Sequence, residues 1–427
     1  MMGAVDSMPR DPSGDGWLTS LCLSRTLMTS IFMTYAACLP VLRGEWAMSA
    51  TAAGSISTAF QLGYAFSLLF FSWLADRVGA RRVFLGSSAL SALAALAFAA
   101  GARSYASGVA LWTLVAVSQG GTYTTAIMLL ADRYPSERRG RAVGWLIASS
   151  SLGYALSLVV TGLALPRGGY PLAFLAAAGG PLAGAALAWP TLRGTPNVVH
   201  ARRAGVRFGT EVLGNARAMR LIAGYTAHSF ELLGMWSWIP AFLTASFRVS
   251  GSAALRAVEL GAYLAAGFHL MGLVASSSMG GLSDRLGRRA VLLGLAAVST
   301  ACSFAFGWLV AWPAAVVVAV GALYGFTALG DSPVLSTALT EAVHPAYLGS
   351  ALALRSLVGF GAGALAPLAF GAVLDLTNPP DLTPTVWGWA FATLGLGGLV
   401  ATWCAWGLER VPPAGRARAA GAGAAPG

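Results

Sequence analysis

Apolar stretches of ~20 residues recur about twelve times along this chain, and each is long enough to cross a bilayer as an α-helix. In lipid, every backbone polar group must be paired within its own segment, which helices achieve. The stretches lack the apolar–polar alternation of barrel strands. We therefore predict an all-α membrane protein with twelve transmembrane helices. The predicted spans are residues 19–42, 49–74, 83–101, 107–131, 141–164, 170–190, 219–246, 259–282, 291–311, 314–340, 348–374 and 386–408.

Positive charge is distributed unevenly around these spans. All 27 basic residues are arginines and the net charge is +11. On the predicted spans, 20 arginines fall on one side of the membrane, five on the other and two inside helices. This is the positive-inside pattern, so we predict a multi-pass protein with both termini cytoplasmic. The charge sets topology and does not indicate a nucleic-acid partner. The arginine, alanine and glycine bias suggests a bacterial cell (inner) membrane.

A short charged segment occurs twice. Residues 76–83 read Asp-Arg-Val-Gly-Ala-Arg-Arg-Val, and residues 284–289, 208 positions later, read Asp-Arg-Leu-Gly-Arg-Arg. A second related pair, residues 132–144 and 341–353, recurs at an offset of 209. Each segment joins two apolar stretches, so the chain is an internal duplication, as in many secondary transporters.

The duplication predicts two pseudo-symmetric six-helix bundles joined by a basic loop. The predicted units are a disordered tail 1–16, a bundle 17–190, a cytoplasmic loop 191–218, a bundle 219–408 and a disordered tail 409–427.

The repeated segment resembles the signature of the major facilitator superfamily, Gly-x(8)-Gly-x(3)-Asp-Arg-x-Gly-x-Arg-Arg. Gly63 matches the first glycine, whereas Ser72 replaces the second and Ala290 ends the second copy. The resemblance spans roughly residues 17 to 408. It implies a secondary transporter that works by alternating access, a monomer without cofactor or metal, and not an enzyme. A chain without lysine also cannot contain the Gly-x(4)-Gly-Lys loop of ATP-driven transport.

In that family, the charged turn is a cytoplasmic latch that helps to hold the outward-facing state; the simpler interpretation is a turn kept inside by its positive charge. The resemblance gives the latch role to Asp76, Arg77, Arg81, Arg82, Asp284, Arg285 and Arg289. Two motifs of proton-coupled members are missing. Ala116 stands where many have an arginine, and the segment 149–157 lacks the Gly-Pro motif of antiporters. Drug–proton antiport is therefore disfavoured.

Six ionisable residues lie within the predicted spans, where a buried charge is costly and functional by default. They are Arg25, His228, Glu231, His269, Asp331 and Arg355. His228 and Glu231, at i and i+3, share a helix face and could exchange a proton. With Asp331, which precedes a helix-breaking Ser-Pro, they are the predicted proton-coupling residues. The alternative is an intrahelical pair that only holds its helix in place.

Arg25 and Arg355 come from opposite halves, and each offers a bidentate fork that suits carboxylate, nitrate or phosphate. The alternative is that each already pairs with an acid, for example Arg25 with Asp331. Aromatic and amide side chains could complete the cavity. The predicted substrate-binding residues are Arg25, Arg355, Tyr35, Gln119, Tyr123, Trp236 and Tyr324.

We therefore predict transport of a small, carboxylate-like anion, coupled to protons. Efflux of amphipathic compounds is an alternative, favoured by Trp236 and Trp238. Transport of nitrate, nitrite or cyanate also fits two arginines. A membrane-embedded enzyme would need a nucleophile or metal site, and the four histidines lack metal-ligand spacing. A non-transporting scaffold would not need the buried charges.

Overall fold

The computed structural model describes residues 15–199, 212–343, 347–378 and 386–408. The predicted tails, apart from Asp15 and Gly16, and the middle of the loop 191–218 lie outside these ranges. All regular structure in the described residues is helical. The elements are α1 (Gly16–Thr29), α2 (Thr34–Glu45), α3 (Ala50–Val78), α4 (Ala80–Gly101), α5 (Tyr105–Arg133), α6 (Ser136–Leu192), α7 (Ala216–Val249), α8 (Ala254–Leu286), α9 (Arg288–Phe306), the short 3-10 helix η3 (Gly307–Leu309), α10 (Ala314–Ala342), α11 (Leu348–Thr377) and α12 (Gly388–Trp406).

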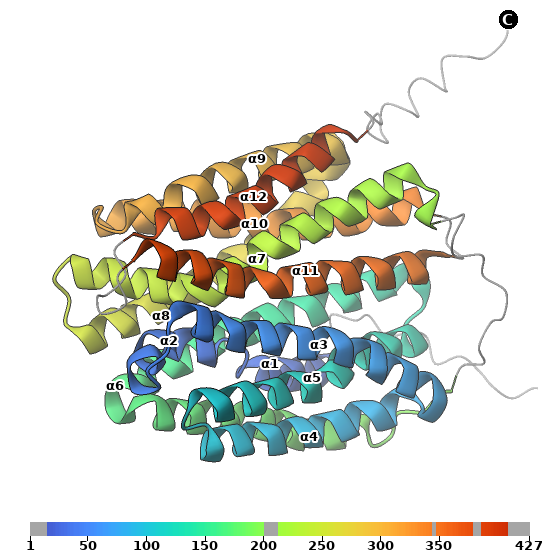
Figure 1. Cartoon of the computed structure of the whole chain (residues 1–427). Helices are drawn as coiled ribbons and strands as arrows, with labels where there is room; N and C mark the ends of the chain where they lie inside the picture. Colours follow the sequence, from blue (N-terminus) through green and yellow to red (C-terminus); the bar gives the residue numbers. More distant parts are fainter. Residues whose placement is uncertain (1–14, 200–211, 344–346, 379–385, 409–427) are drawn as a thin grey trace, which may run out of the picture.

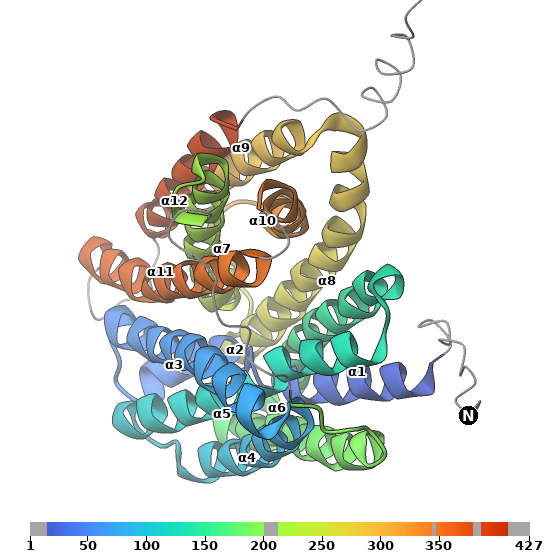
Figure 2. The same ribbon diagram turned by 90° about the vertical axis from the view of Figure 1, so that its right-hand side faces the viewer.

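The helices form two bundles, α1–α6 and α7–α12, which lie side by side in both views of the molecule (Figures 1 and 2). Ten helical segments in the described part are long and apolar enough to cross a membrane. One of them, residues 141–192 of α6, is broken at Gly168 and Gly169 and provides two crossings. The 34-residue α7 is not among these ten, but it is long enough to cross and packs among them in the second bundle. The predicted all-α fold with twelve membrane helices is confirmed.

The internal duplication is visible in the backbone of the two charged turns. Gly79 has φ 92° and ψ 144°, and Gly287 has φ 90° and ψ 145°. Side chains with a Cβ rarely adopt a positive φ, so glycine is required at this step between two antiparallel helices. The two halves of the chain therefore use the same backbone conformation at equivalent turns, as expected for an internal duplication.

The first crossing is interrupted between α1 and α2, at residues 30–33. Ser157 of α6 provides a hydrogen-bond acceptor for a backbone N–H at the break. Its Oγ accepts from Met33 N at 3.1 Å and lies 3.0 Å from Thr34 Oγ1. Unpaired backbone groups cannot be left exposed to lipid, so this neighbour makes the interruption possible. The break places Phe32 at the bundle interface.

The start of α1 is anchored by Asp15, which caps the helix through Trp17 N at 2.9 Å. Asp15 Oδ2 also accepts from Tyr134 OH at 2.6 Å and from Arg133 Nη2 at 3.2 Å. Burial raises the pKa of Asp15, but the hydrogen bonds from Tyr134 and Trp17 and the charge of Arg133 outweigh it, so its pKa lies below the ordinary value. These contacts tie α1 to the α5–α6 turn.

The bundles meet most closely at one end, which we call the sealed end. There a Cβ on Gly54 of α3 would overlap the carbonyl oxygen of Pro367, and a Cβ on Gly371 of α11 would overlap that of Ala50. Small residues permit such backbone contact between membrane helices. The opposite end, which we call the basic end, carries the turns at Gly79 and Gly287.

Candidate functional site

A cavity of about 560 Å³ lies between the two bundles, a size typical of small-molecule sites. Six of the ten residues predicted for substrate binding or proton coupling line it: Arg25, Tyr35, Tyr123, His228, Trp236 and Arg355. Gln119, Glu231, Asp331 and Tyr324 do not. The lining comes from helices of both bundles, as a site for alternating access requires.

Arg25 lies on α1 and is almost fully buried, with 1% of its surface exposed. Its Nη1 donates to Thr122 Oγ1 of α5, and its guanidinium lies 5.5 Å from the ring centre of Tyr123. Its Nε is buried and has no partner among the described residues. No acid within the described part of the chain forms an ion pair with Arg25, so the alternative pairing with Asp331 is not formed.

Arg355 approaches the cavity from α11. Its Nη1 donates to Ser336 Oγ at 2.7 Å, and its guanidinium stacks 4.3 Å from the ring centre of Tyr225. Its Nε also has no partner in the described ranges, and no described acid pairs with it. Two arginines from opposite bundles thus line one cavity, and the Nε–H of each has no hydrogen-bond acceptor among the described residues.

A chain of contacts connects Arg355 to a buried acid–histidine pair. Ser336 Oγ donates to the carbonyl of Ser332 at 2.7 Å, and Ser332 Oγ lies 2.8 Å from His228 Nε2. His228 Nδ1 lies 3.0 Å from Asp331 Oδ1. This contact becomes an ion pair when His228 is protonated, and that oxygen has no aligned hydrogen bond among the described residues. His228 therefore stands between the cavity and Asp331.

Pro333 contributes to this arrangement by interrupting the hydrogen-bond ladder of α10. A proline has no N–H, so it leaves the carbonyl of Leu329 without its helical donor. Ser276 Oγ of α8 approaches that carbonyl at 3.5 Å. The adjacent residues Asp331 and Ser332 lie on different faces of the helix, and of the two only Ser332 lines the cavity.

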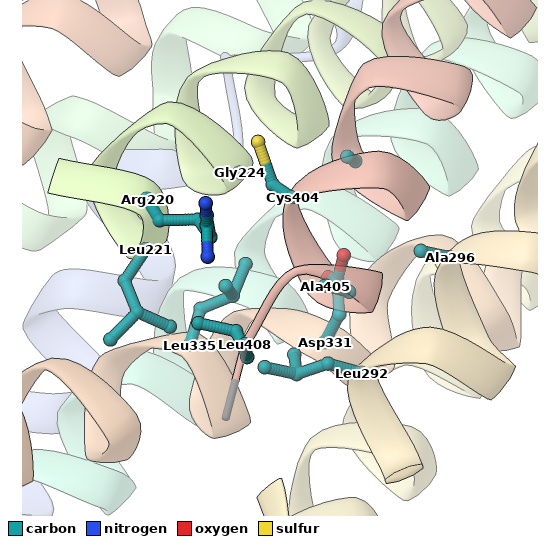
Figure 3. A pocket seen from close by; sticks show the side chains of 11 residues that line it. Arg220, Leu221, Gly224, Leu292, Ala296, Asp331, Leu335, Cys404, Ala405 and Leu408 are labelled. Carbon is teal, nitrogen blue, oxygen red and sulfur yellow. The ribbon is translucent and has the colours of Figure 1, made fainter. Parts of the chain in front are cut away.

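Asp331 lines a separate small crevice of about 10 Å³ between α7, α9, α10 and α12 (Figure 3). Arg220 reaches into this crevice from the first turn of α7, and Leu221 and Cys404 lie beside it. A space of that volume accommodates about one water molecule. The crevice is too small for an organic substrate, so the large cavity is the candidate transport site.

Glu231 is placed differently from the predicted shared face with His228. Its side chain points into the interior of the second bundle, where Oε1 accepts from Ser299 Oγ and Ser303 Oγ of α9, each at 2.7 Å. Ser303 Oγ lies 2.6 Å from Tyr324 OH. Glu231 and Tyr324 therefore belong to a buried polar cluster behind the cavity wall. At i and i+3 the two side chains diverge enough for different helices to surround them.

Three further residues were predicted to bind substrate. Tyr35 and Gln119 already donate a hydrogen bond within the described part of the protein, whereas Trp236 does not. Tyr35 OH donates to the carbonyl of Ala53 at 2.9 Å, so its hydroxyl is already used. Gln119 Nε2 donates to the carbonyl of Met28 at 2.8 Å and braces the helix that carries Arg25. The Nε1–H of Trp236 is buried without a partner among the described residues, although the residue lines the cavity.

The charged turns make contacts within their own bundles. Arg81 Nη2 donates to the carbonyl of Arg193 at 3.1 Å, and Arg77 stacks 3.7 Å from the ring centre of Trp73. The exposed Asp76 forms no ion pair with any residue in the described ranges. The backbone N–H of Arg82 donates to the Asn197 side chain at 3.2 Å. No hydrogen bond or ion pair between the bundles involves this turn in the described residues.

In the second copy, the sequence analysis missed the residue with most contacts. Arg288 lies 2.6 Å from Asp284 and 2.8 Å from Glu341 at the end of α10. Arg289 donates to the carbonyl of Trp406, and Arg285 is exposed. Glu341 is the first residue of the repeated segment 341–353, and Arg288 lies in the repeated segment 284–289. The presence of two repeated charged segments in one half was the signal that could have suggested this bridge.

Asp375, near the end of α11, was also missed. Its carboxylate accepts from Ala50 N at 2.8 Å and from Thr51 N at 2.7 Å. These N–H groups open α3 of the other bundle, where the partial positive charge of a helix N-terminus stabilises an anion. The sequence separation of over 300 residues gave no signal for this contact.

Comparison with known proteins supports a transporter fold. The model of the Major Facilitator Superfamily matches residues 21–328 and 257–426. The chain is 26% identical over 393 residues to the probable sulfoacetate transporter SauU of Cupriavidus necator, covering 84% of this chain and 86% of that protein. It is 29% identical over 131 residues to the niacin transporter NiaP of Acinetobacter baylyi, covering 31% of this chain and only 30% of the relative. The crystal structure of a D-xylose-proton symporter superposes with a TM-score of 0.71 at 16% identity, covering 92% of this chain and 98% of that one.

Proposed function

From the premise that this chain belongs to the Major Facilitator Superfamily and is a transporter rather than an enzyme, we propose that it carries a small organic anion together with protons. The observation that carries this proposal is the pair of arginines, Arg25 and Arg355. They line one cavity from opposite bundles, and no described acid pairs with either. Two cations without a directly paired acid, in a low-dielectric cavity, attract an anion.

The proposed coupling site is the pair His228–Asp331, with Glu231 assigned to packing inside the second bundle. When the pair holds a proton it is an imidazolium and a carboxylate with no net charge. When the proton leaves, the pair has a charge of −1 and opposes the field of the two arginines. An anion therefore binds more tightly when the pair is protonated, and binding of the two is mutually reinforcing.

The contacts Arg355–Ser336–Ser332–His228 supply a physical connection between the anion and proton sites. Ser336 Oγ accepts from Arg355 and donates to the main-chain carbonyl of Ser332, so the route runs through the backbone of α10 to the hydroxyl that contacts His228. We infer that substrate arrival is sensed at His228 by this route.

The names of two relatives agree with an organic acid. Sulfoacetate carries a carboxylate and a sulfonate, and niacin is a pyridine carboxylic acid. The niacin transporter is matched over only 30% of its length. Its name therefore supports an organic acid as the class of substrate and does not identify niacin as the substrate.

We place the basic end in the cytoplasm, with both termini, following the arginine distribution. Residues 17–190 and 219–408 are then the two moving units. Closure of the cavity at the basic end would bring the exposed Asp76 turn toward the other bundle, where the latch has the role implied by the family resemblance. Aromatic residues in the cavity wall also leave room for amphipathic substrates, but the unpaired arginines favour anions.

The test is binding by the purified protein to acetate, benzoate, sulfoacetate and nitrate, measured as a shift in melting temperature and by calorimetry. Replacing Arg25 or Arg355 by lysine keeps the charge and removes the planar fork. Each replacement should weaken binding of the best anion about tenfold to a hundredfold, the value of a lost charge-assisted bond. Arg103→Lys, at an exposed turn, is the matched control. Binding unaffected by both lysine variants would contradict the proposal.

A further inference from the structure

Five aromatic side chains form a continuous arc across the cavity wall, which begins and ends in the second bundle and crosses the first bundle between. The rings of Phe360, Tyr64, Phe32, Tyr154 and Trp236 follow one another with centroid separations of 6.2, 5.5, 5.4 and 5.5 Å. All five line the cavity. We call this set the aromatic arc. Its members come from α11, α3, the α1–α2 break, α6 and α7, so the arc exists only when the bundles are together.

The aromatic arc lies deeper than the arginines. At 1.5 Å per residue, Arg25 and Arg355 lie about 10–14 Å from the ends of their helices at the basic end, whereas the arc residues lie about 18–30 Å from theirs. The cavity is therefore cationic toward the basic end and aromatic toward the sealed end. A ligand that matches both parts has an anionic group at one end and a flat apolar body at the other.

The charge balance of the cavity fits one anionic group. With His228 and the enclosed Glu231 neutral, Arg25, Arg355 and, behind the cavity wall, Asp331 leave one positive charge unbalanced. A single carboxylate neutralises it. Together with a proton on His228, a monocarboxylate adds no net charge, so the empty and the loaded cavity present the same charge when the bundles reorient.

Trp236 supplies a second, independent sign of a ligand. Its indole N–H is buried in the aromatic arc without a partner among the described residues. A buried donor without an acceptor is unfavourable. An acceptor on the ring of a ligand would satisfy it, whereas the plain ring of benzoate leaves it unpaired.

Resting on the proposed function, we propose that the transported anion is an aromatic monocarboxylate, whose ring stacks on the aromatic arc and whose carboxylate faces Arg25 and Arg355. Ring pairs prefer offset or edge-to-face geometry at centroid distances of about 4.5–7 Å. The arc already has this spacing, so an added ring extends it.

The experiment compares four compounds by calorimetry on the full-length protein: benzoate, cyclohexanecarboxylate, acetate and benzyl alcohol. Benzoate should bind about threefold to tenfold more tightly than cyclohexanecarboxylate, the gain of ring–ring contact. It should bind about a hundredfold more tightly than acetate, which lacks the buried ring. Acetate or cyclohexanecarboxylate binding as tightly as benzoate overturns the aromatic inference but leaves the anion proposal standing. Benzyl alcohol binding as tightly as benzoate overturns the anion proposal itself.

A variant pair separates stacking from general apolar contact. Phe360→Leu keeps an apolar side chain in the arc and removes its ring, so the preference for benzoate over cyclohexanecarboxylate should fall toward one. Phe66→Leu, at a side chain on α3 that is 65% exposed, is the matched control and should keep the preference. An unchanged preference in Phe360→Leu, with binding of benzoate intact, contradicts stacking on the arc.

Discussion

The carboxylate of Asp375 holds Thr51 by two bonds, one to its backbone N–H at 2.7 Å and one to its hydroxyl at 2.6 Å. The two residues belong to different bundles, and with Ala50 N they form a clamp at the sealed end. The clamp must break before that end can open. It therefore contributes to the stability of the conformation described here relative to one that opens there.

Asp375→Asn keeps the shape of the side chain and removes its charge, so the protein should populate conformations open at the sealed end more often. Loss of a charge-assisted bond is worth about 1.5–3 kcal/mol, or roughly tenfold to a hundredfold in the conformational ratio. Spin labels at the exposed positions of Arg103 and Trp312, one in each bundle, report the separation. Glu45→Gln, an exposed acid of the first bundle, should leave the distance distribution unchanged.

Gly54→Ala should also favour opening of the sealed end, because the new methyl group overlaps the carbonyl of Pro367. Overpacking of this kind costs about 1–3 kcal/mol. Gly361→Ala, on α11 with open space around its Cβ position, is the control. The same spin-label distances measure both variants. Equal distributions for the two would show that the bundles tolerate the methyl group.

Asp331→Asn should abolish accumulation driven by a proton gradient in proteoliposomes while leaving substrate exchange at equilibrium. The variant cannot stabilise the protonated His228 by an ion pair, so anion affinity should rise less at low pH than it does in the wild type. Glu231→Gln removes the other buried acid of α7 and α10, but its carboxylate lies behind the cavity wall. It should keep the pH dependence; the reverse result would move coupling to Glu231.

Asp15→Asn should lower the melting temperature at pH 7, and the difference from wild type should shrink in acid. The pKa of Asp15 lies below its ordinary value of about 3.9. A carboxyl whose pKa is depressed by folding contributes stability above its unfolded pKa, and that stability is lost as pH falls through the folded pKa. Thermal unfolding between pH 7 and pH 2.5 measures the difference. A constant gap would contradict the role of the charge.

The fold was predictable from the sequence because its determinants are local or repeated. The apolar lengths set the spans, and Gly79 and Gly287 recur in equivalent turns. The cavity was partly predictable: Arg25, His228 and Arg355 are costly in lipid and therefore stand out. Glu231 stood out equally, yet it faces the bundle interior.

Which way a buried polar residue faces depends on its neighbours across the interface, and one sequence does not contain that information. The hydroxyls of Ser299 and Ser303 attract Glu231 from a helix about 70 residues away. Asp375 finds Thr51 across 324 residues. Ring contacts such as Phe32–Tyr154 arise only after both bundles assemble.

The contacts of Gly54 with Pro367 and of Gly371 with Ala50 form the seal from main-chain atoms. Recognition, in contrast, depends on side chains such as Arg355 and Trp236. The two tasks therefore occupy separate sets of positions. Substitutions in the cavity can alter the compound that is carried while the gate keeps its shape, so a library that varies the cavity alone offers a route to transporters with new cargo.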